Sequence, residues 1–214
     1  MSEAVEVVVD RREQLPGVRD QGIKPLCLAF AASDLNAFNN SLCSHLSVEY
    51  LAYYAYQLMN TNKTDQGLSI PSVIQILKEN GQIIEELMPY DENRTELISP
   101  PLKQTEVFKT ISSEQACATD SVILALDNNK IVLLGLSLTP SFFYPRFPYV
   151  LNDEIGERGL HAVTAVGYGL YQNKNVILIR NSWGENWGEG GYAWLTAECI
   201  NNRTLTSIQL TGNS

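Results

Sequence analysis

The chain has 214 residues, of which 15 are Lys or Arg and 24 are Asp or Glu, so its formal net charge is −9 near neutral pH. A net negative surface argues against nucleic acids and anionic membranes as main partners, because it cannot neutralise phosphates broadly. Apolar and aromatic residues make up 44% of the sequence, which excludes a disordered chain. The length suits one large domain or two closely packed lobes.

The N-terminal sequence lacks the features of a secretory signal. Residues Met1 to Asp10 include three acidic residues and only one short apolar run, Val7 to Val9, instead of a basic start and a long apolar stretch. Later apolar runs, such as Ile131 to Leu136, are far shorter than the roughly 20 residues that a membrane span needs. We therefore expect a cytoplasmic protein, with secretion by a signal-independent route left open.

The four cysteines are widely spaced and form no C-x-x-C pair: Cys27, Cys43, Cys117 and Cys199. Since the chain has only two histidines, we expect no metal site and no cofactor. Reduced thiols in a cytosolic compartment are the simplest interpretation of this pattern.

The first half of the chain is expected to be helical. Apolar residues recur at helical spacing from Leu26 to about Phe38. A second helix is expected from Ser47, whose hydroxyl can cap it. A third is expected from about Ile70, with Pro71 in its first turn and Gly81 at its end.

The second half changes to short β-rich runs after Pro100 and Pro101. One further helix is expected from about Ser112 to Asn128. The β-rich runs, separated by Gly and Asn turns, cover residues 130–138, 160–169, 175–183 and 190–195.

These elements predict an α+β fold with two lobes. A helical lobe spans about residues 12–105, and a β-barrel-like lobe spans about 106–214 together with the N-terminal residues. Because no flexible linker separates them, we expect a single domain over residues 1–214 with the active site in a cleft between the lobes.

Three separated segments carry residues suited to chemistry. Cys27 lies at the expected start of the first helix, where unpaired N–H groups and about half a positive charge favour a thiolate over a thiol. His161 begins an apolar strand, and Asn181 directly follows another. Each residue alone would suit an ordinary structural role, but together they suggest a nucleophile, a base and an orienting group.

These segments resemble the papain family of cysteine peptidases. His161 and Asn181 follow Cys27 by 134 and 154 residues, near the roughly 130–150 residues of that family. Weaker similarity at Leu46 to Glu49 and Gly81 to Tyr90 extends the resemblance over about Leu15 to Leu195. The three main blocks are Q-G-x(4)-C-x-A-F at Gln21 to Phe30, H-A-V-x-A-V-G-Y-G at His161 to Gly169, and N-S-W-G-x-x-W-G-x-x-G-Y at Asn181 to Tyr192.

The resemblance implies a role for each matched residue. Cys27 would be the nucleophile, His161 the general base and acid, Asn181 the group that orients the imidazole, and Gln21 the side-chain half of the oxyanion hole. A thiol of pKa about 8.5 is only slightly ionised at pH 7, so His161 is needed to hold a thiolate–imidazolium pair before an acyl-enzyme thioester forms. Trp183 is expected to shield the histidine–asparagine hydrogen bond from water.

The sequence also departs from the family. Lys24 stands where many secreted relatives have a disulfide-bonded cysteine, so that disulfide is not expected. Only about 12–15 residues precede the first matched block, so we expect no inhibitory pro-segment. Three explanations for its absence are left open: a trimmed chain, a restraining partner or compartment, and a narrow substrate range. In both respects the chain is similar to bacterial papain-like peptidases more than to lysosomal ones.

Substrate-binding residues are predicted from the same resemblance. Gly67 and Leu68 stand near the family's C-x-G-G loop and are expected to offer backbone and an apolar wall to the residue preceding the scissile bond. Leu160, next to the histidine, is expected to add a second wall, and Trp183 is counted with this group. The predicted second subsite is therefore apolar.

The leading interpretation is a cysteine peptidase that hydrolyses a peptide or protein substrate. A regulatory partner is left open, and the oligomeric state is not predicted. The alternatives are another thiol acyl transfer, by a transpeptidase, amidase or deamidase, and a non-catalytic papain-fold module that binds peptides. The joint presence of Gln21, Cys27, His161 and Asn181 argues against the non-catalytic module.

Overall fold

A computed structural model describes residues 4–102 and 106–212, and the chain divides into two compact units. The boundary expected near residue 105 adjoins residues 103–105, which lie outside the described part. The first unit, here the β unit, comprises Met1–Glu13, Gly17–Asp20 and Glu114–Gln209. The second, here the helical unit, comprises Gln14–Pro16, Gln21–Ser113 and Leu210–Ser214.

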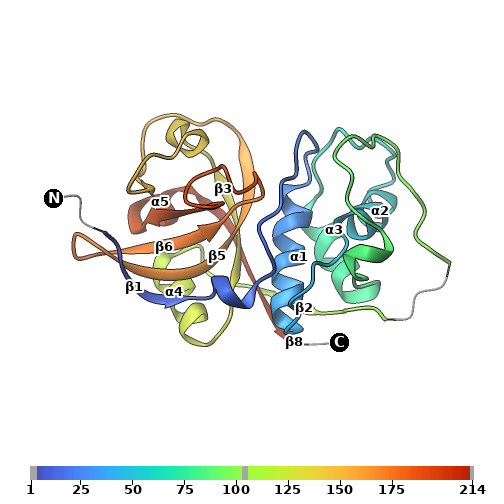
Figure 1. The fold of residues 1–214 in the computed structure, drawn as a ribbon, viewed down its shortest axis with the longest axis horizontal. Helices are drawn as coiled ribbons and strands as arrows, with labels where there is room; N and C mark the ends of the chain where they lie inside the picture. The colour runs from blue at the N-terminus through green and yellow to red at the C-terminus, as the bar shows by residue number, and fades with distance from the viewer. Residues whose placement is uncertain (1–3, 103–105, 213–214) are drawn as a thin grey trace. The chain divides into compact units, whose positions relative to one another are not determined.

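The helical unit is built on three helices that pack on one another (Figure 1): α1 (Cys27–Asn39), α2 (Val48–Leu58) and α3 (Ile70–Glu79). A short 3-10 turn, η2 (Glu85–Leu87), follows them. All three predicted helices are confirmed, with starts within one residue of those expected. Their buried faces are mainly apolar, so burial of the apolar side chains stabilises the unit.

The helix ends follow the signals in the sequence. Ser47 accepts a hydrogen bond from the Tyr50 N–H at 3.1 Å and so caps α2. Gly81 ends α3 with a φ of +68°, and a Cβ at this position would lie 2.6 Å from the Phe108 carbonyl oxygen. Only glycine fits both the backbone conformation and the available space.

Most of a mixed sheet lies in the β unit; its order is β2-β8-β3-β5-β6-β7-β4, and β1 pairs with β5. Residues 111–113 of β2 and 210–212 of β8 belong to the helical unit. Adjacent strands from β3 to β7 pair antiparallel, whereas β4 and β7 are parallel. Among the described residues β2 and β4 end the sheet, which is therefore open. The strands are β1 (Glu6–Asp10), β2 (Ile111–Glu114), β3 (Val132–Ser137), β4 (Val150–Leu151), β5 (Leu160–Tyr171), β6 (Lys174–Arg180), β7 (Tyr192–Thr196) and β8 (Thr204–Gly212).

Helices α4 (Thr119–Asp127) and α5 (Ala197–Arg203) pack against the sheet strands, as Figure 1 shows. Two single-turn 3-10 segments, η1 (Arg12–Gln14) and η3 (Pro140–Phe143), complete the elements. No helix in the described part of the chain is long and apolar enough to cross a membrane.

The helix predicted from about Ser112 is wrong in its first turns. Residues Ile111–Glu114 form strand β2, and α4 begins only at Thr119. Pairing with β8 determines the conformation of this segment, and such pairing overrides local helix propensity. Strand β1 was not predicted, because four of its five residues are exposed and its sequence lacks the alternation of a half-buried strand.

We predict that Ser47→Ala destabilises the protein more than Ser69→Ala. Both serines cap a helix and both hydroxyls also donate, Ser69 to Ser72 Oγ at 2.9 Å and Ser47 to the Met88 carbonyl at 2.6 Å. Only Ser47 is fully buried, so only its loss leaves a buried carbonyl without this donor. We expect a loss of about 2 kcal/mol for Ser47→Ala and about 1 kcal/mol for Ser69→Ala in the free energy of unfolding. Urea denaturation measures both losses, and equal losses would contradict the added contribution of the buried Ser47–Met88 bond.

Candidate active site

Strand pairing in the β unit brings His161 and Asn181 together. His161 is the second residue of β5, and Asn181 directly follows the end of β6. The two strands are antiparallel, with Thr164 opposite Arg180, so the start of β5 lies beside the end of β6. The Nε2 atom of His161 lies 2.7 Å from the Oδ1 atom of Asn181.

The neighbouring backbone fixes which atom of this bond donates. The Ser182 N–H, which can only donate, lies 2.8 Å from the same Oδ1 atom of Asn181. That atom is therefore an acceptor, so His161 donates from Nε2. The neutral imidazole then carries its lone pair on Nδ1, which is the atom that can act as a base.

Asn181 itself is held by the surrounding chain. Its backbone N–H donates to the Gly191 carbonyl at 3.0 Å. The preceding Arg180 is buried and donates to the Gly17 carbonyl at 2.6 Å and to the Tyr192 hydroxyl at 2.9 Å. These bonds leave the asparagine little freedom to turn away from His161.

Aromatic rings enclose the histidine. The Trp183 ring centroid lies 4.6 Å from that of His161, and the Phe142 centroid lies 5.8 Å from it. His161 is consequently only 6% exposed. Burial lowers the pKa of His161 to about 4, while the hydrogen bond with Asn181 acts in the opposite direction. Trp183 therefore lies beside the imidazole, and its shielding of the histidine–asparagine bond stays a prediction.

Gln21 lies on the loop of the helical unit that leads to Cys27. Cys27 is the half-buried first residue of α1, whose N-cap residue makes no side-chain capping bond. Gly22 turns the loop with a φ of +54°, and a Cβ there would collide with the Glu92 side chain. The buried Gln21 donates from Nε2 to the Lys24 carbonyl at 2.8 Å, which uses one of its two amide hydrogens.

The predicted substrate-binding residues occupy three places. A Cβ on the exposed Gly67 would lie 3.8 Å from the Pro25 carbonyl oxygen, so Gly67 lies beside the loop that leads to Cys27. Leu68 follows it and is half-buried. In the β unit, Leu160 is 71% exposed at the start of β5. Their roles in binding stay predictions, as does the pairing of Cys27 with His161.

A model of the papain family of cysteine proteases matches residues 5–210. The chain belongs to this family. Chymopapain of Carica papaya is 31% identical over 201 residues, which cover 89% of this chain and 54% of chymopapain. Mexicain of Jacaratia mexicana is 35% identical over 131 residues, which cover 60% of this chain and 58% of mexicain. The chain thus spans little more than half the length of the curated relatives it matches.

Solved structures of the family have the same fold. Xylellain, a cysteine protease from Xylella fastidiosa, matches with a TM-score of 0.75 and 21% identity, covering 97% of this chain and 91% of xylellain. The bromelain protease from Ananas comosus, in complex with the E64 inhibitor, also matches with a TM-score of 0.75 and 21% identity, covering 95% of this chain and 98% of that one.

Cys117 and Cys199 of this papain-family chain are poorly suited to attack. Burial raises the pKa of Cys199 to about 12, and burial is also the main cause that raises the pKa of Cys117. Cys43 is exposed, outside any helix or strand. Within residues 4–102 and 106–212, no group of three or more His, Cys, Asp or Glu side chains could hold a metal ion.

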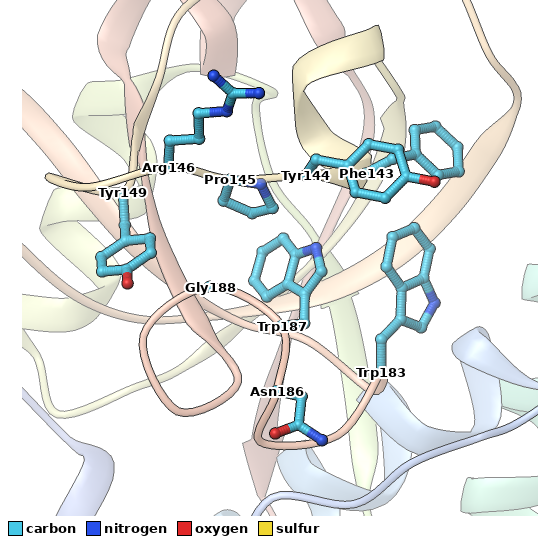
Figure 2. Close-up of a pocket in the computed structure, with 9 residues that line it drawn as sticks. All are labelled: Phe143, Tyr144, Pro145, Arg146, Tyr149, Trp183, Asn186, Trp187 and Gly188. Carbon is cyan, nitrogen blue, oxygen red and sulfur yellow. The ribbon is translucent and has the colours of Figure 1, made fainter.

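A pocket of about 480 Å³ in the β unit was not predicted from the sequence. Figure 2 shows two loops facing each other, with the tryptophans on one and Pro145 and Tyr149 on the other. The aromatic-rich run at residues 142–149 was an available signal for it. Its lining residues are Phe143, Tyr144, Pro145, Arg146, Tyr149, Trp183, Asn186, Trp187 and Gly188.

We predict that the imidazole of His161 in the Cys27→Ala variant stays neutral down to about pH 4, because burial disfavours its charge. The unfolded state has a histidine pKa near 6.5, so it binds a proton that the folded state does not bind between these values. Stability is thus full above about pH 6.5 and falls by on the order of 3 kcal/mol as the pH drops to about 4.

NMR titration of the histidine resonances measures the pKa, and urea denaturation across this pH range measures the stability. The matched control is Cys27→Ala with His161→Asn, which removes the titrating group and should flatten this part of the pH dependence. A histidine that titrates near 6.5 in Cys27→Ala would contradict the prediction.

Proposed function

We propose that this chain is a cysteine peptidase that hydrolyses peptide bonds through a Cys27 thiolate, a His161 imidazolium and an acyl-enzyme thioester. The observation that carries the proposal is the 2.7 Å bond from His161 to Asn181. It leaves Nδ1 as the basic atom of an imidazole buried under Trp183. Membership of the papain family supports Cys27 as the nucleophile.

Acylation begins when Nδ1 of His161 takes the proton of the Cys27 thiol. The thiolate attacks the carbonyl carbon of the scissile bond, and the negative charge moves to the carbonyl oxygen. We assign the Gln21 Nε2–H and the Cys27 backbone N–H as donors to that oxygen. As the C–N bond breaks, His161 returns its proton to the leaving amine, and the acyl group stays on sulfur as a thioester.

Deacylation reverses the roles. His161, neutral again, takes a proton from a water molecule, which attacks the thioester carbonyl. The second tetrahedral intermediate collapses with cleavage of the C–S bond, and the proton passes from His161 to the sulfur. The acid product leaves and the thiol is restored. Asn181 keeps Nε2–H donating throughout, so that Nδ1 faces the chemistry in both steps.

The burial of His161 constrains the charge state of the proposed pair. An isolated imidazole in this environment is neutral at pH 7, because its pKa is about 4. An imidazolium can form there only if an anion lies beside it, and the thiolate of Cys27 is the proposed anion. The two groups would then titrate as one coupled system with shared pKa values.

The aromatic pocket is proposed to bind the leaving side of the substrate. His161 gives its proton to the leaving amine, so the chain beyond the scissile bond departs past the imidazole. Trp183 contacts His161 and also lines the pocket. The guanidinium of Arg146 points away from the two tryptophans (Figure 2), so aromatic and apolar side chains fit this pocket better than acidic ones.

We also propose that the substrate is a peptide or protein and that the enzyme works in the cytoplasm. Cys43, Cys117 and Cys199 are free thiols, which suits a reducing compartment. A partner that regulates activity is part of the same proposal, whereas nucleic acids and membranes are not proposed partners.

We predict that Cys27→Ala abolishes peptide hydrolysis with the fold intact, and that His161→Ala lowers kcat more than Asn181→Ala. Loss of the base removes proton transfer, whereas loss of Asn181 only frees the ring to turn. We expect falls of about 10⁴-fold for His161→Ala and about 10²-fold for Asn181→Ala. Steady-state kinetics on a fluorogenic peptide library measures these values.

An epoxide inactivator of thiol peptidases serves as the matching chemical test. Mass spectrometry should find the adduct on Cys27 at pH 6–7, with Cys43 as the exposed control thiol. Equal activity in all three variants would refute the assignment of these three residues. An adduct on Cys43 alone would favour a non-catalytic binding module. Thioester transfer to added amines in place of water would favour a transpeptidase.

For the aromatic pocket, we predict that peptides with an aromatic residue shortly after the scissile bond have a kcat/KM about tenfold above those with glycine there, because the ring is buried on binding. Tyr149→Ala should remove most of this preference while the glycine peptides are cleaved as before. If the preference for aromatic residues survives in Tyr149→Ala, the leaving side of the substrate binds outside this pocket.

A further inference from the structure

A buried ion pair joins the loop before Cys27 to helix α2. The Nζ atom of Lys24 lies 2.6 Å from the Oε1 atom of Glu49, which stands in the first turn of α2. The two side chains are only 9% and 5% exposed. Lysine and glutamate are seldom buried to this extent unless they are paired.

Other groups surround the pair and satisfy it. The Asp91 N–H donates to the same Oε1 atom at 3.4 Å, and Arg94 lies 4.0 Å from it. The Lys24 ammonium also lies 5.0 Å from the centre of the Tyr90 ring. Lys24 is therefore held by a carboxylate and an aromatic face that come from different segments of the helical unit.

The backbone of Lys24 connects this pair to both proposed oxyanion donors. Its carbonyl accepts hydrogen bonds from the Gln21 Nε2–H at 2.8 Å and from the Leu26 N–H at 2.8 Å. The first bond orients the side-chain donor, and the second sets the backbone directly before Cys27. Tyr90 adds a further tie, because its hydroxyl donates to the Gln21 carbonyl at 2.5 Å.

The burial of the pair argues that it contributes more than stability. Removing two charges from water costs much of what their attraction returns, so an apolar pair of similar size would stabilise the fold as well or better. The pair of Arg12 and Asp10 has a similar distance of 2.7 Å but is about one-third exposed, where no such cost arises. What the buried pair adds is one fixed position for the Lys24 backbone.

We propose that Lys24 and Glu49 are positioning residues, which hold the Lys24 carbonyl so that Gln21 and the Cys27 N–H point at the developing oxyanion. This inference rests on the proposed function. It predicts a defect confined to steps that form an oxyanion. Peptide hydrolysis forms one, whereas alkylation of Cys27 by iodoacetamide displaces iodide at a saturated carbon and forms none.

The test compares Glu49→Gln, Lys24→Met and the double variant Lys24→Met/Glu49→Leu with the unaltered protein. We expect kcat for a fluorogenic peptide to fall about tenfold to 10²-fold with KM unchanged, because only transition-state binding is lost. The rate of Cys27 alkylation by iodoacetamide should stay within about twofold. The double variant, which leaves no unpaired buried charge, should keep its melting temperature, so it answers the question even where the single variants fail to fold.

Arg12→Met is the matched control, because it removes one partner of an exposed pair, and its kcat should be unchanged. Unaltered kcat in the double variant would overturn the inference, and so would equal falls in kcat and in alkylation, which mark a merely structural role. Failure of the proposed function looks different: the unaltered protein would then cleave no peptide although Cys27 still reacts with iodoacetamide.

Discussion

The hydrogen bond between His161 and Asn181 is the constraint on which the β unit's part of the site depends. Its geometry requires one register of β5 on β6, with Thr164 opposite Arg180. A slip by one residue would turn the imidazole to the opposite face of the sheet, because side chains alternate along a strand. The Ser182 N–H then fixes the acceptor atom, and with it the tautomer. The register of β5 on β6 thus determines that the imidazole lone pair lies on Nδ1.

Burial of that histidine has two opposite consequences. Trp183 and Phe142 exclude water, which strengthens the bond to Asn181 but makes a charged imidazole costly. The ring is therefore a neutral base until an anion compensates its charge. In the proposed mechanism, the Cys27 thiolate supplies this negative charge when the proton moves to His161.

Prediction from the sequence succeeded where local pattern and local structure agree. The three helices of the first half carry their own caps and stops at Ser47, Pro71 and Gly81, and each is present. Prediction failed where pairing between distant segments determines conformation: β1 and β8 lack a clear pattern of their own, and β2 was assigned to a helix. Two motif blocks contain His161, Asn181 and Trp183, but the aromatic pocket arises only when two loops distant in sequence face each other.

The ion pair of Lys24 could not be predicted from the sequence for a different reason. The sequence shows that a cysteine is missing at this position, yet it does not show which interaction holds the loop before Cys27 instead of a disulfide. The partner, Glu49, lies 25 residues away on α2, and only the folded unit brings the two together. A disulfide at such a place would hold the loop only under oxidising conditions, whereas an ion pair is indifferent to thiol redox balance. With an ion pair in place of a disulfide, the loop before Cys27 depends on burial and not on oxidation. The loop stays fixed as long as α2 keeps the Glu49 carboxylate away from water.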